Sequence, residues 1–172
     1  MPSPEPAPGA PGISPTWTSS AKDIVGCSLG VSRLWFTVGF GILNEIYYPR
    51  VDIPQIRDLG FIVAGPDGFW SKVKRVANHR LRRLAPGAPA IEIVHEHPRY
   101  TLRLRIAPDP RRDVLAIECR LEAAADMALY VLLAPHLGAT GIRQPRGRRF
   151  LAATPRHVGR TRPLRGGTCR GR

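Results

Sequence analysis

The sequence predicts an all-β fold, an antiparallel β-sandwich, and two observations carry this prediction. Short runs of β-branched and aromatic residues recur along the chain, and residues that favour turns separate them. The 172 residues include 17 glycines and 18 prolines, which favours many turns over long helices. Because no long helical stretch divides the runs, we expect successive strands to pair antiparallel and to stack as two sheets.

The individual strands follow from local composition and from turn signals such as GPDG at 65–68. Most runs are dominated by residues that pack well on a pleated surface. A return strand is expected to open at Phe69 and Trp70, after the GPDG turn. The other strands are expected at 34–38, 42–48, 59–63, 91–95, 100–106, 114–121 and 128–134.

Two of these runs carry opposite patterns. In YTLRLRI (100–106) apolar residues alternate with polar ones, so Arg103 and Arg105 are expected in water and the other face in the core. The run ALYVLLA (128–134) is continuously apolar. It is typical of a strand buried on both faces, although a helix segment is not excluded by length alone.

Charge divides the chain into three parts. All 13 acidic residues precede residue 127, whereas 10 of the 26 basic residues lie from Gly138 onward and all of these are arginines. We therefore expect a flexible Pro-rich lead at 1–15, one domain at 16–138 and an Arg-rich tail at 139–172. Two interpretations of the tail stay open, a phosphate-binding segment and the disordered product of an out-of-frame GC-rich gene. The abrupt charge asymmetry favours the second.

The sequence also limits where the protein is expected to act and what its cysteines are expected to do. No cationic region followed by an apolar run opens the sequence, and no run is long enough to span a membrane, so a cytoplasmic location is expected. Cys27, Cys119 and Cys169 lack the spacing of zinc ligands and are expected as reduced, mostly buried thiols.

The stretch GILNEIYYPRVD (41–52) is the strongest candidate for a binding site, because a strand needs no such polar cluster in order to pack. Tyrosine suits interfaces and sugar stacking since it combines a large apolar ring with one hydroxyl. The alternative is that Tyr47 and Tyr48 straddle a strand, with one of the two in the core. The candidate residues for a substrate rim or a domain interface are Asn44, Glu45, Tyr47, Tyr48, Arg50 and Asp52.

Complete catalytic or metal-binding constellations are not evident. Glu45 and Asp52 resemble an acid/base pair only in residue type, because the intervening corner does not fix their separation. His95 and His97 lie on one face of a strand but lack a third ligand, so solvated edge histidines are expected. We predict no catalysis by this chain alone, no cofactor and no metal site.

Several motifs, taken in order, resemble the N-terminal domain of bacterial glucoamylases and glucodextranases, of glycoside hydrolase family fifteen. The resemblance covers roughly residues 11–138, and several motifs in one order are more specific than any single pattern. Ile24 and Cys27 depart from the residues expected there. The motifs are WTSSAKDIVGCS (17–28), RLWFTVGFGILNEIYYPRVD (33–52), RDLGFIV (57–63), DPRRDVL (109–115) and LYVLLAPHLG (129–138).

The resemblance implies a fold, a function and a partner. The fold would be part of the large β-sandwich called a supersandwich, which is galactose-mutarotase-like. The domain would pack on an (α/α) barrel that carries two catalytic glutamates, and 41–52 would lie near its active-site mouth. The chain is then expected to be a truncated, non-catalytic domain that shapes an α-glucan site. Two alternatives are a basic-tailed nucleic-acid-binding protein and a free-standing carbohydrate-binding module.

Overall fold

The computed structural model describes residues 21–76 and 78–135, which form ten strands and one short 3-10 helix. The expected lead at 1–15 and tail at 139–172 lie outside these residues, as do both ends of the expected domain. The elements are β1 (Ile24–Cys27), β2 (Trp35–Gly39), β3 (Ile42–Tyr47), β4 (Pro54–Ala64), β5 (Trp70–Lys72), η1 (Val73–Arg75), β6 (His79–Arg83), β7 (Ile91–His97), β8 (Tyr100–Pro108), β9 (Leu115–Ala123) and β10 (Ala128–Pro135).

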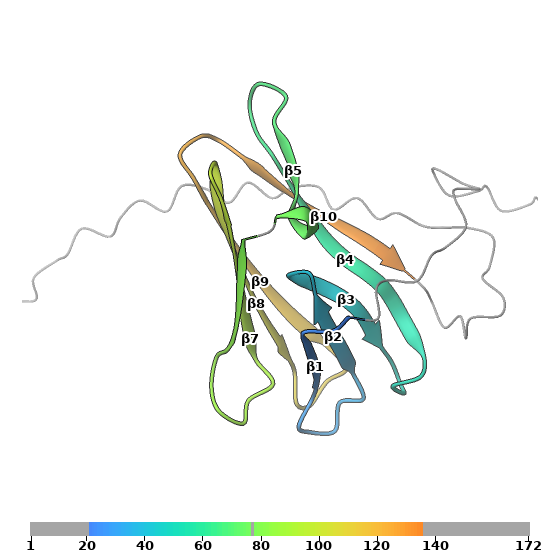
Figure 1. Ribbon diagram of the computed structural model, residues 1–172. Coiled ribbons are helices and arrows are strands. Elements are labelled where there is room, and N and C mark those ends of the chain that lie inside the picture. Colours follow the sequence, from blue (N-terminus) through green and yellow to red (C-terminus); the bar gives the residue numbers. More distant parts are fainter. Residues whose placement is uncertain (1–20, 77, 136–172) are drawn as a thin grey trace, which may run out of the picture.

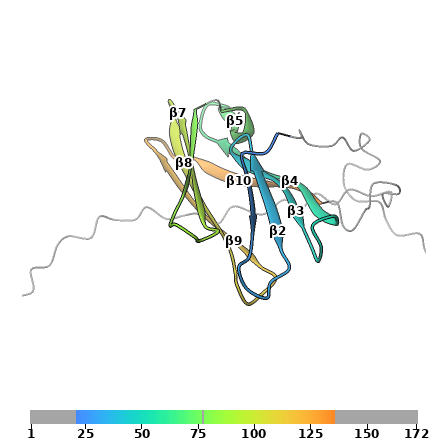
Figure 2. The same ribbon diagram turned by 60° about the horizontal axis from the view of Figure 1, so that its bottom comes forward.

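The strands form two antiparallel sheets, as predicted. The first has the order β1-β2-β3-β4-β10, with β5 also paired to β4, and the second has the order β6-β7-β8-β9. Figure 1 shows the second sheet on the left and the first on the right, and Figure 2 shows the same two layers from another direction. The part of the chain that the structure describes contains no helix with the length and hydropathy of a membrane span.

The core lies between the sheets and draws on both. Its fully buried side chains include Phe36 and Val38 from the first sheet and Ile93, Leu102 and Leu104 from the second. The strand at 100–106 buries the apolar face that its alternation predicts. Burial of such side chains contributes roughly 1.5–3 kcal/mol each, so this shared core holds the two layers together.

Two turns have the backbone geometry that their sequences indicate. Phe40 and Gly41, between β2 and β3, both have positive φ, 56° and 71°. Positive φ at both central positions is the feature of the two-residue hairpin turn that matches strand twist. The predicted GPDG turn also has positive φ at Asp67 and Gly68, so it is confirmed.

Three strand predictions need correction. β1 and β6 were not expected. β1 has only four residues, and β6 (HRLRR) is mostly polar, as an edge strand can be, so neither has the apolar pattern of a strand. The run at 128–134 is a strand but is not buried on both faces. Tyr130 and Leu132 are exposed because they lie on the face of β10 that points away from the core, whereas Leu129 and Val131 on the other face pack against it.

The outer face of the second sheet carries an ion-pair cluster around one carboxylate. Glu92 is buried among Arg82, Arg103 and Arg105, with nitrogen–oxygen distances of 2.6, 3.2 and 3.0 Å. Hydrogen bonding from Arg105 is the largest of the effects that lower the pKa of Glu92. Arg103 and Arg105 face outward as predicted, but they are partly covered and neutralise Glu92.

Candidate functional site

Three loops meet at one end of the sandwich, after β1, β3 and β8: residues 28–34, 48–53 and 109–114. The backbone N–H of Val31 donates to the carbonyl oxygen of Pro110 (2.9 Å), and Ser28 Oγ donates to the carbonyl oxygen of Asp109 (3.3 Å). A Cβ added at Gly30 would lie 2.0 Å from the Pro110 carbonyl oxygen. Glycine is therefore required where the first and third loops join the two sheets.

Arg33 ties these two loops to the loop at 48–53. Its guanidinium Nη2 donates to the Tyr48 hydroxyl (2.6 Å) and to Asp113 Oδ2 (3.2 Å). Its backbone N–H donates to Asp113 Oδ1 (2.7 Å), and its guanidinium carbon lies 5.0 Å from the centre of the Tyr48 ring. The backbone N–H of Arg33, reinforced by the guanidinium, holds the pKa of Asp113 below its ordinary value.

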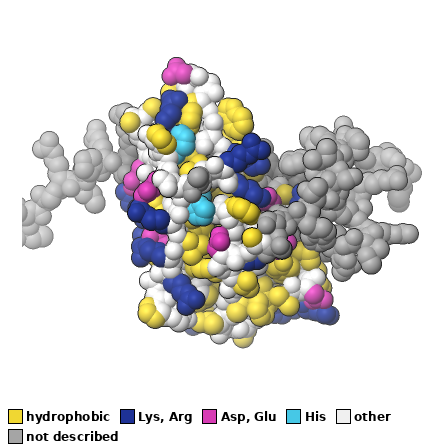
Figure 3. All heavy atoms as spheres, viewed as in Figure 1, with side chains coloured by type: hydrophobic (Ala, Val, Ile, Leu, Met, Phe, Trp, Pro, Cys, Tyr) yellow, Lys and Arg dark blue, Asp and Glu magenta, His cyan; other side chains and the backbone are white. Residues whose placement is uncertain are grey.

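Large apolar side chains from all three loops remain in water at this end. Single exposed apolar residues scattered over a surface are normal. Several of them at one end of a molecule, bordered by charged groups, resemble an interaction site. Hydrophobic side chains also gather at the lower end of the molecule in Figure 3. The exposed apolar residues of the three loops are called the loop-end surface; they are Leu29 (71% exposed), Val31 (80%), Val51 (54%) and Val114 (49%).

The candidate residues Asn44, Glu45 and Tyr47 hold the segment that precedes β1. Asn44 is fully buried, and its Nδ2 donates to the carbonyl oxygen of Ala21 over 3.4 Å. Glu45 Oε2 pairs with Lys22 Nζ (2.8 Å) and accepts from the Tyr47 hydroxyl (2.6 Å). Burial, with the neighbouring Glu45 carboxylate, raises the pKa of Tyr47. These contacts position the chain, and an interface role for the three residues stays a prediction.

The other three candidates, Tyr48, Arg50 and Asp52, lie at the loop end. Arg50 and Asp52 are exposed and form a two-point ion pair, with Nε–Oδ1 and Nη2–Oδ2 distances of 3.0 and 2.9 Å. The structure therefore divides the predicted cluster into an anchoring group and a surface group. Since Glu45 and Asp52 are each engaged by their own partners, their arrangement does not favour an acid/base pair.

The alternative interpretation of the two tyrosines is wrong. Tyr47 and Tyr48 are both partly exposed, and neither belongs to the core cluster. The bulge between Ile46 and Tyr47 in the pairing with β4 interrupts simple alternation at this corner. Each hydroxyl instead forms a hydrogen bond with a charged side chain: the Tyr47 hydroxyl donates to Glu45, and the Tyr48 hydroxyl accepts from Arg33.

The prediction for the histidines is also wrong for His95, which is fully buried rather than solvated. Its Nε2 lies 2.8 Å from the Gly41 carbonyl oxygen, so Nε2–H donates to it. His97 lies on the same face and stacks on Tyr100, with ring centres 4.7 Å apart. Among residues 21–76 and 78–135, no three His, Cys, Asp or Glu side chains come together as metal ligands.

Sequence reasoning missed the residues that organise this end of the molecule. Arg33 and Asp113 are 80 residues apart in the sequence, so no local pattern indicates their pairing. Asp109 fixes its own turn, because its carboxylate accepts from the backbone N–H groups of Arg111 and Arg112. Leu29 and Val31, in the loop SLGVSR, were visible only as apolar residues outside any strand.

Comparisons with known proteins agree with one another. A sequence profile of the family described as "Glucodextranase, domain N" matches residues 7–156, which includes the whole of 11–138. The chain is 28% identical over 138 residues to a glucoamylase from Clostridium sp. (strain G0005), over 76% of this chain and 20% of the relative. A crystal structure of a bacterial glucoamylase complexed with acarbose matches at 27% identity and a TM-score of 0.72, over 77% of this chain and 21% of that chain. The chain therefore spans about a fifth of the length of each relative.

Proposed function

This chain belongs to the glucodextranase domain N family, and from that premise we propose that it is the non-catalytic N-terminal β-sandwich of an α-glucan hydrolase. In this role it docks a catalytic domain of the glucoamylase or glucodextranase type and shapes the substrate site there. The loop-end surface is the observation that carries the docking proposal. The matched relatives hold about four fifths of their length outside the matched region, so a large partner exists in proteins of this kind.

The loop-end surface has the composition of an interface. Its centre is aliphatic, and its rim carries Arg33, Arg50 and Asp52. Interfaces of this kind gain most of their affinity from apolar side chains that lose water on binding, while charged rims fix register. Val31, which is 80% exposed, sits on a loop that is already held by the hydrogen bond from its own backbone N–H to the Pro110 carbonyl oxygen. Little ordering entropy is then lost on docking.

The rim also supplies groups that suit contact with a glucan. The Tyr48 hydroxyl accepts a hydrogen bond from Arg33 Nη2 over 2.6 Å, so the orientation of the ring is fixed. A tyrosine ring offers an apolar face to a sugar ring and a polar edge to water. We place Tyr48, Arg50 and Asp52 at the border between the docked domain and its substrate, where they shape the site without taking part in bond cleavage.

A chimera tests this proposal. The matched fifth of the Clostridium glucoamylase would be replaced by this chain, and glucose release from maltoheptaose would be measured for the chimera and for the 172-residue chain alone. We expect activity in the chimera and none in the chain. Val31→Asp should lower the chimera's activity at least tenfold, because docking would bury an unpaired carboxylate. Hydrolysis by the chain alone would overturn the non-catalytic role. Full activity of the Val31→Asp chimera would overturn docking through this surface.

A further inference from the structure

The strand β10 leaves one edge of the first sheet unpaired, because β4 is its one neighbouring strand among residues 21–76 and 78–135. Figure 1 shows β10, in orange, beside β4. An unpaired edge presents a row of backbone N–H and C=O groups, which is a template for pairing with another strand. The partner that fits this edge is therefore an extended segment.

The sequence of β10 distinguishes it from the other strands at sheet edges. β1 and β5 have only four and three residues. β6 (HRLRR) and β9 (LAIECRLEA) carry charged side chains. Short strands and charges are devices that protect sheet edges from pairing. β10 reads ALYVLLAP, without a charge and with its proline only at the last position, so it lacks these devices.

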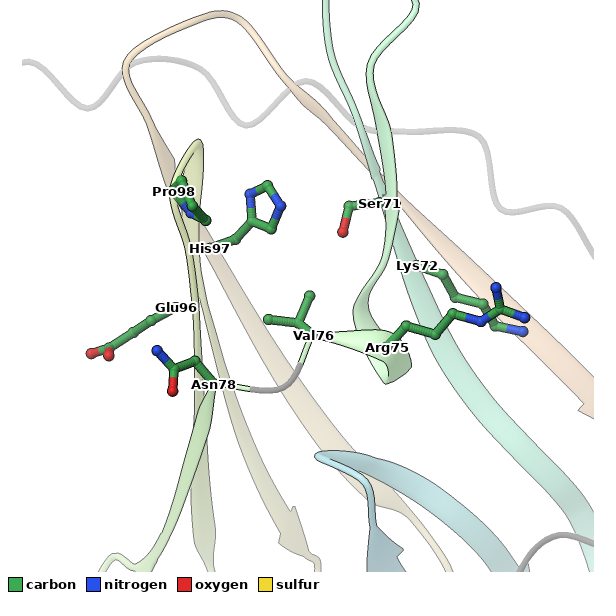
Figure 4. A pocket seen from close by; sticks show the side chains of 8 residues that line it. All are labelled: Ser71, Lys72, Arg75, Val76, Asn78, Glu96, His97 and Pro98. Carbon is green, nitrogen blue, oxygen red and sulfur yellow. The ribbon is translucent and has the colours of Figure 1, made fainter.

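The outward face of β10 is apolar and in contact with water. Tyr130 and Leu132 are 39% and 36% exposed on this face. Tyr130 lies opposite Ile62 of β4, which in turn lies opposite Lys72 of β5. Figure 4 shows Ser71 pointing toward β7 and Lys72 pointing the other way, so this row of side chains faces away from the core. A strand added beside β10 would cover part of Tyr130 and Leu132.

The core is also incompletely covered where β9 and β10 border it. Of the apolar side chains that pack on the core but stay partly exposed, most come from these two strands and the turn between them. An added strand would take water away from this apolar surface, which favours association. The residues are Leu115, Ile117, Cys119, Leu121, Met127, Leu129 and Val131.

A strand that complements β10 has to be apolar on both faces and uncharged over residues 128–134. β6 and β9 would bring arginine or glutamate side chains beside Tyr130 and Leu132. In the sequence of 1–20 and 136–172, the longest runs without glycine, proline or a charged residue are TWTSS (16–20) and FLAAT (150–154). The segment that matches β10 in length and character is β10 itself.

We propose that β10 pairs antiparallel with β10 of a second copy of this chain. Such a pair has a two-fold axis, so the same surface serves both copies. Full overlap of residues 128–134 places the axis at Val131, and Tyr130 then lies opposite Leu132 of the second copy. Directly opposed side chains are the pairs that stabilise a sheet. This edge is separate from the loop-end surface, so the inference does not depend on docking.

Sedimentation equilibrium of the 172-residue chain tests the proposal. We expect a monomer–dimer equilibrium whose dissociation constant rises at least tenfold in Leu132→Lys, because lysine on an edge strand opposes pairing. Val25→Lys is the matched control, since Val25 is 62% exposed on β1, at the other end of the sheet order. This variant should dimerise like the parent, and circular dichroism checks that both variants are folded.

Hydrogen exchange gives a second readout that needs no variant. Exchange in residues 128–134 should become slower as the concentration of the chain is raised, whereas exchange in the edge strand β6 should not change. Protection of 128–134 that is independent of concentration would show that a segment of the same chain covers this edge, and it would overturn the proposal.

Three other results would also overturn it. These are a monomer at every concentration, a dissociation constant that Leu132→Lys leaves unchanged, and loss of the dimer in Val31→Asp, which would place self-association at the loop-end surface. The proposed function fails separately, because docking is measured by glucose release from the chimera.

Discussion

The imidazole of His95, from the middle of the second sheet, donates its Nε2–H to the carbonyl oxygen of Gly41, in the β2–β3 turn of the first sheet, over 2.8 Å. This hydrogen bond joins the two layers inside the core, where His95 is fully buried. The other ring nitrogen, Nδ1, is buried and has no hydrogen-bond partner among the described residues. A second proton on the ring would therefore be placed where nothing can accept it.

This arrangement makes stability depend on pH. Burial, more than the nearby His79, lowers the pKa of His95 from 6.5 to about 4. The unfolded chain then binds more protons between these values, so stability is fully present above pH 6.5 and falls as the pH drops toward 4. We expect a loss of about 2 kcal/mol in unfolding free energy between pH 7 and pH 5 from this group. Urea titrations at both pH values measure it, and His95→Gln should reduce the difference. An equal difference in the variant would exclude His95 as its source.

Gly41 should be the hardest to replace of the described glycines with positive φ. Its φ is +71°, and an added Cβ would lie 2.3 Å from His95 Cε1. Gly68 is a matched control, since its φ is +70° and nothing lies within 4 Å of an added Cβ. We expect Gly68→Ala to cost about 1 kcal/mol from backbone strain alone, and Gly41→Ala about 2–4 kcal/mol because overpacking adds to the strain. Thermal unfolding of the two variants measures this, and equal losses would contradict the contact with His95.

Glu92 should stabilise the second sheet more than any exposed acid on that face. Its carboxylate is buried and holds Arg82, Arg103 and Arg105. We expect Glu92→Gln to cost about 1–3 kcal/mol, because charge-assisted hydrogen bonds are lost and three cations repel one another. Glu122→Gln, which removes an exposed pair with Arg120, should cost no more than about 0.5 kcal/mol. Chemical denaturation of both variants compares them, and the reverse order would refute this role for Glu92.

Cys119 should react slowly with alkylating reagents. Burial, aided by the Glu118 charge, raises the pKa of the Cys119 thiol to about 11. The thiolate is the reactive form, so alkylation by iodoacetamide at pH 8 should be roughly a hundredfold slower than for a free cysteine. Mass spectrometry of the Cys119 peptide over time gives the rate. A rate equal to that of a model thiol would show that Cys119 is accessible and ionised.

Much of the fold could be predicted from the sequence because the features that define a strand or a turn depend on residues that are adjacent in the sequence. Alternation at 100–106 and the GPDG turn each follow from the chemistry of a few adjacent residues. The edge position of β10 could not be predicted, since an apolar run does not reveal which strands flank it. The buried state of His95 depends on the Gly41 carbonyl 54 residues away, which no local pattern contains.

The site was predicted less completely, for the same reason. The stretch at 41–52 was singled out as a candidate binding site, and that role stays a prediction. The structure divides its residues between the anchor around Lys22 and the loop end. Arg33 joins loops that are distant in the sequence, so the shape of the loop end depends on tertiary contacts. Leu29 and Val31 could be identified as part of a candidate interface only from the structure, which places them exposed at the same end of the sandwich as Tyr48.

Hydrogen–deuterium exchange of the loop end tests the docking claim most directly. Exchange at residues 28–34 and 109–114 would be compared between the chain alone and the chimera with the Clostridium glucoamylase, with the opposite turn at 65–69 as an internal control. We predict slower exchange in both loops of the chimera, no change at 65–69, and loss of the protection in Val31→Asp. Equal exchange of the two loops in the chain and the chimera would contradict docking through the loop-end surface.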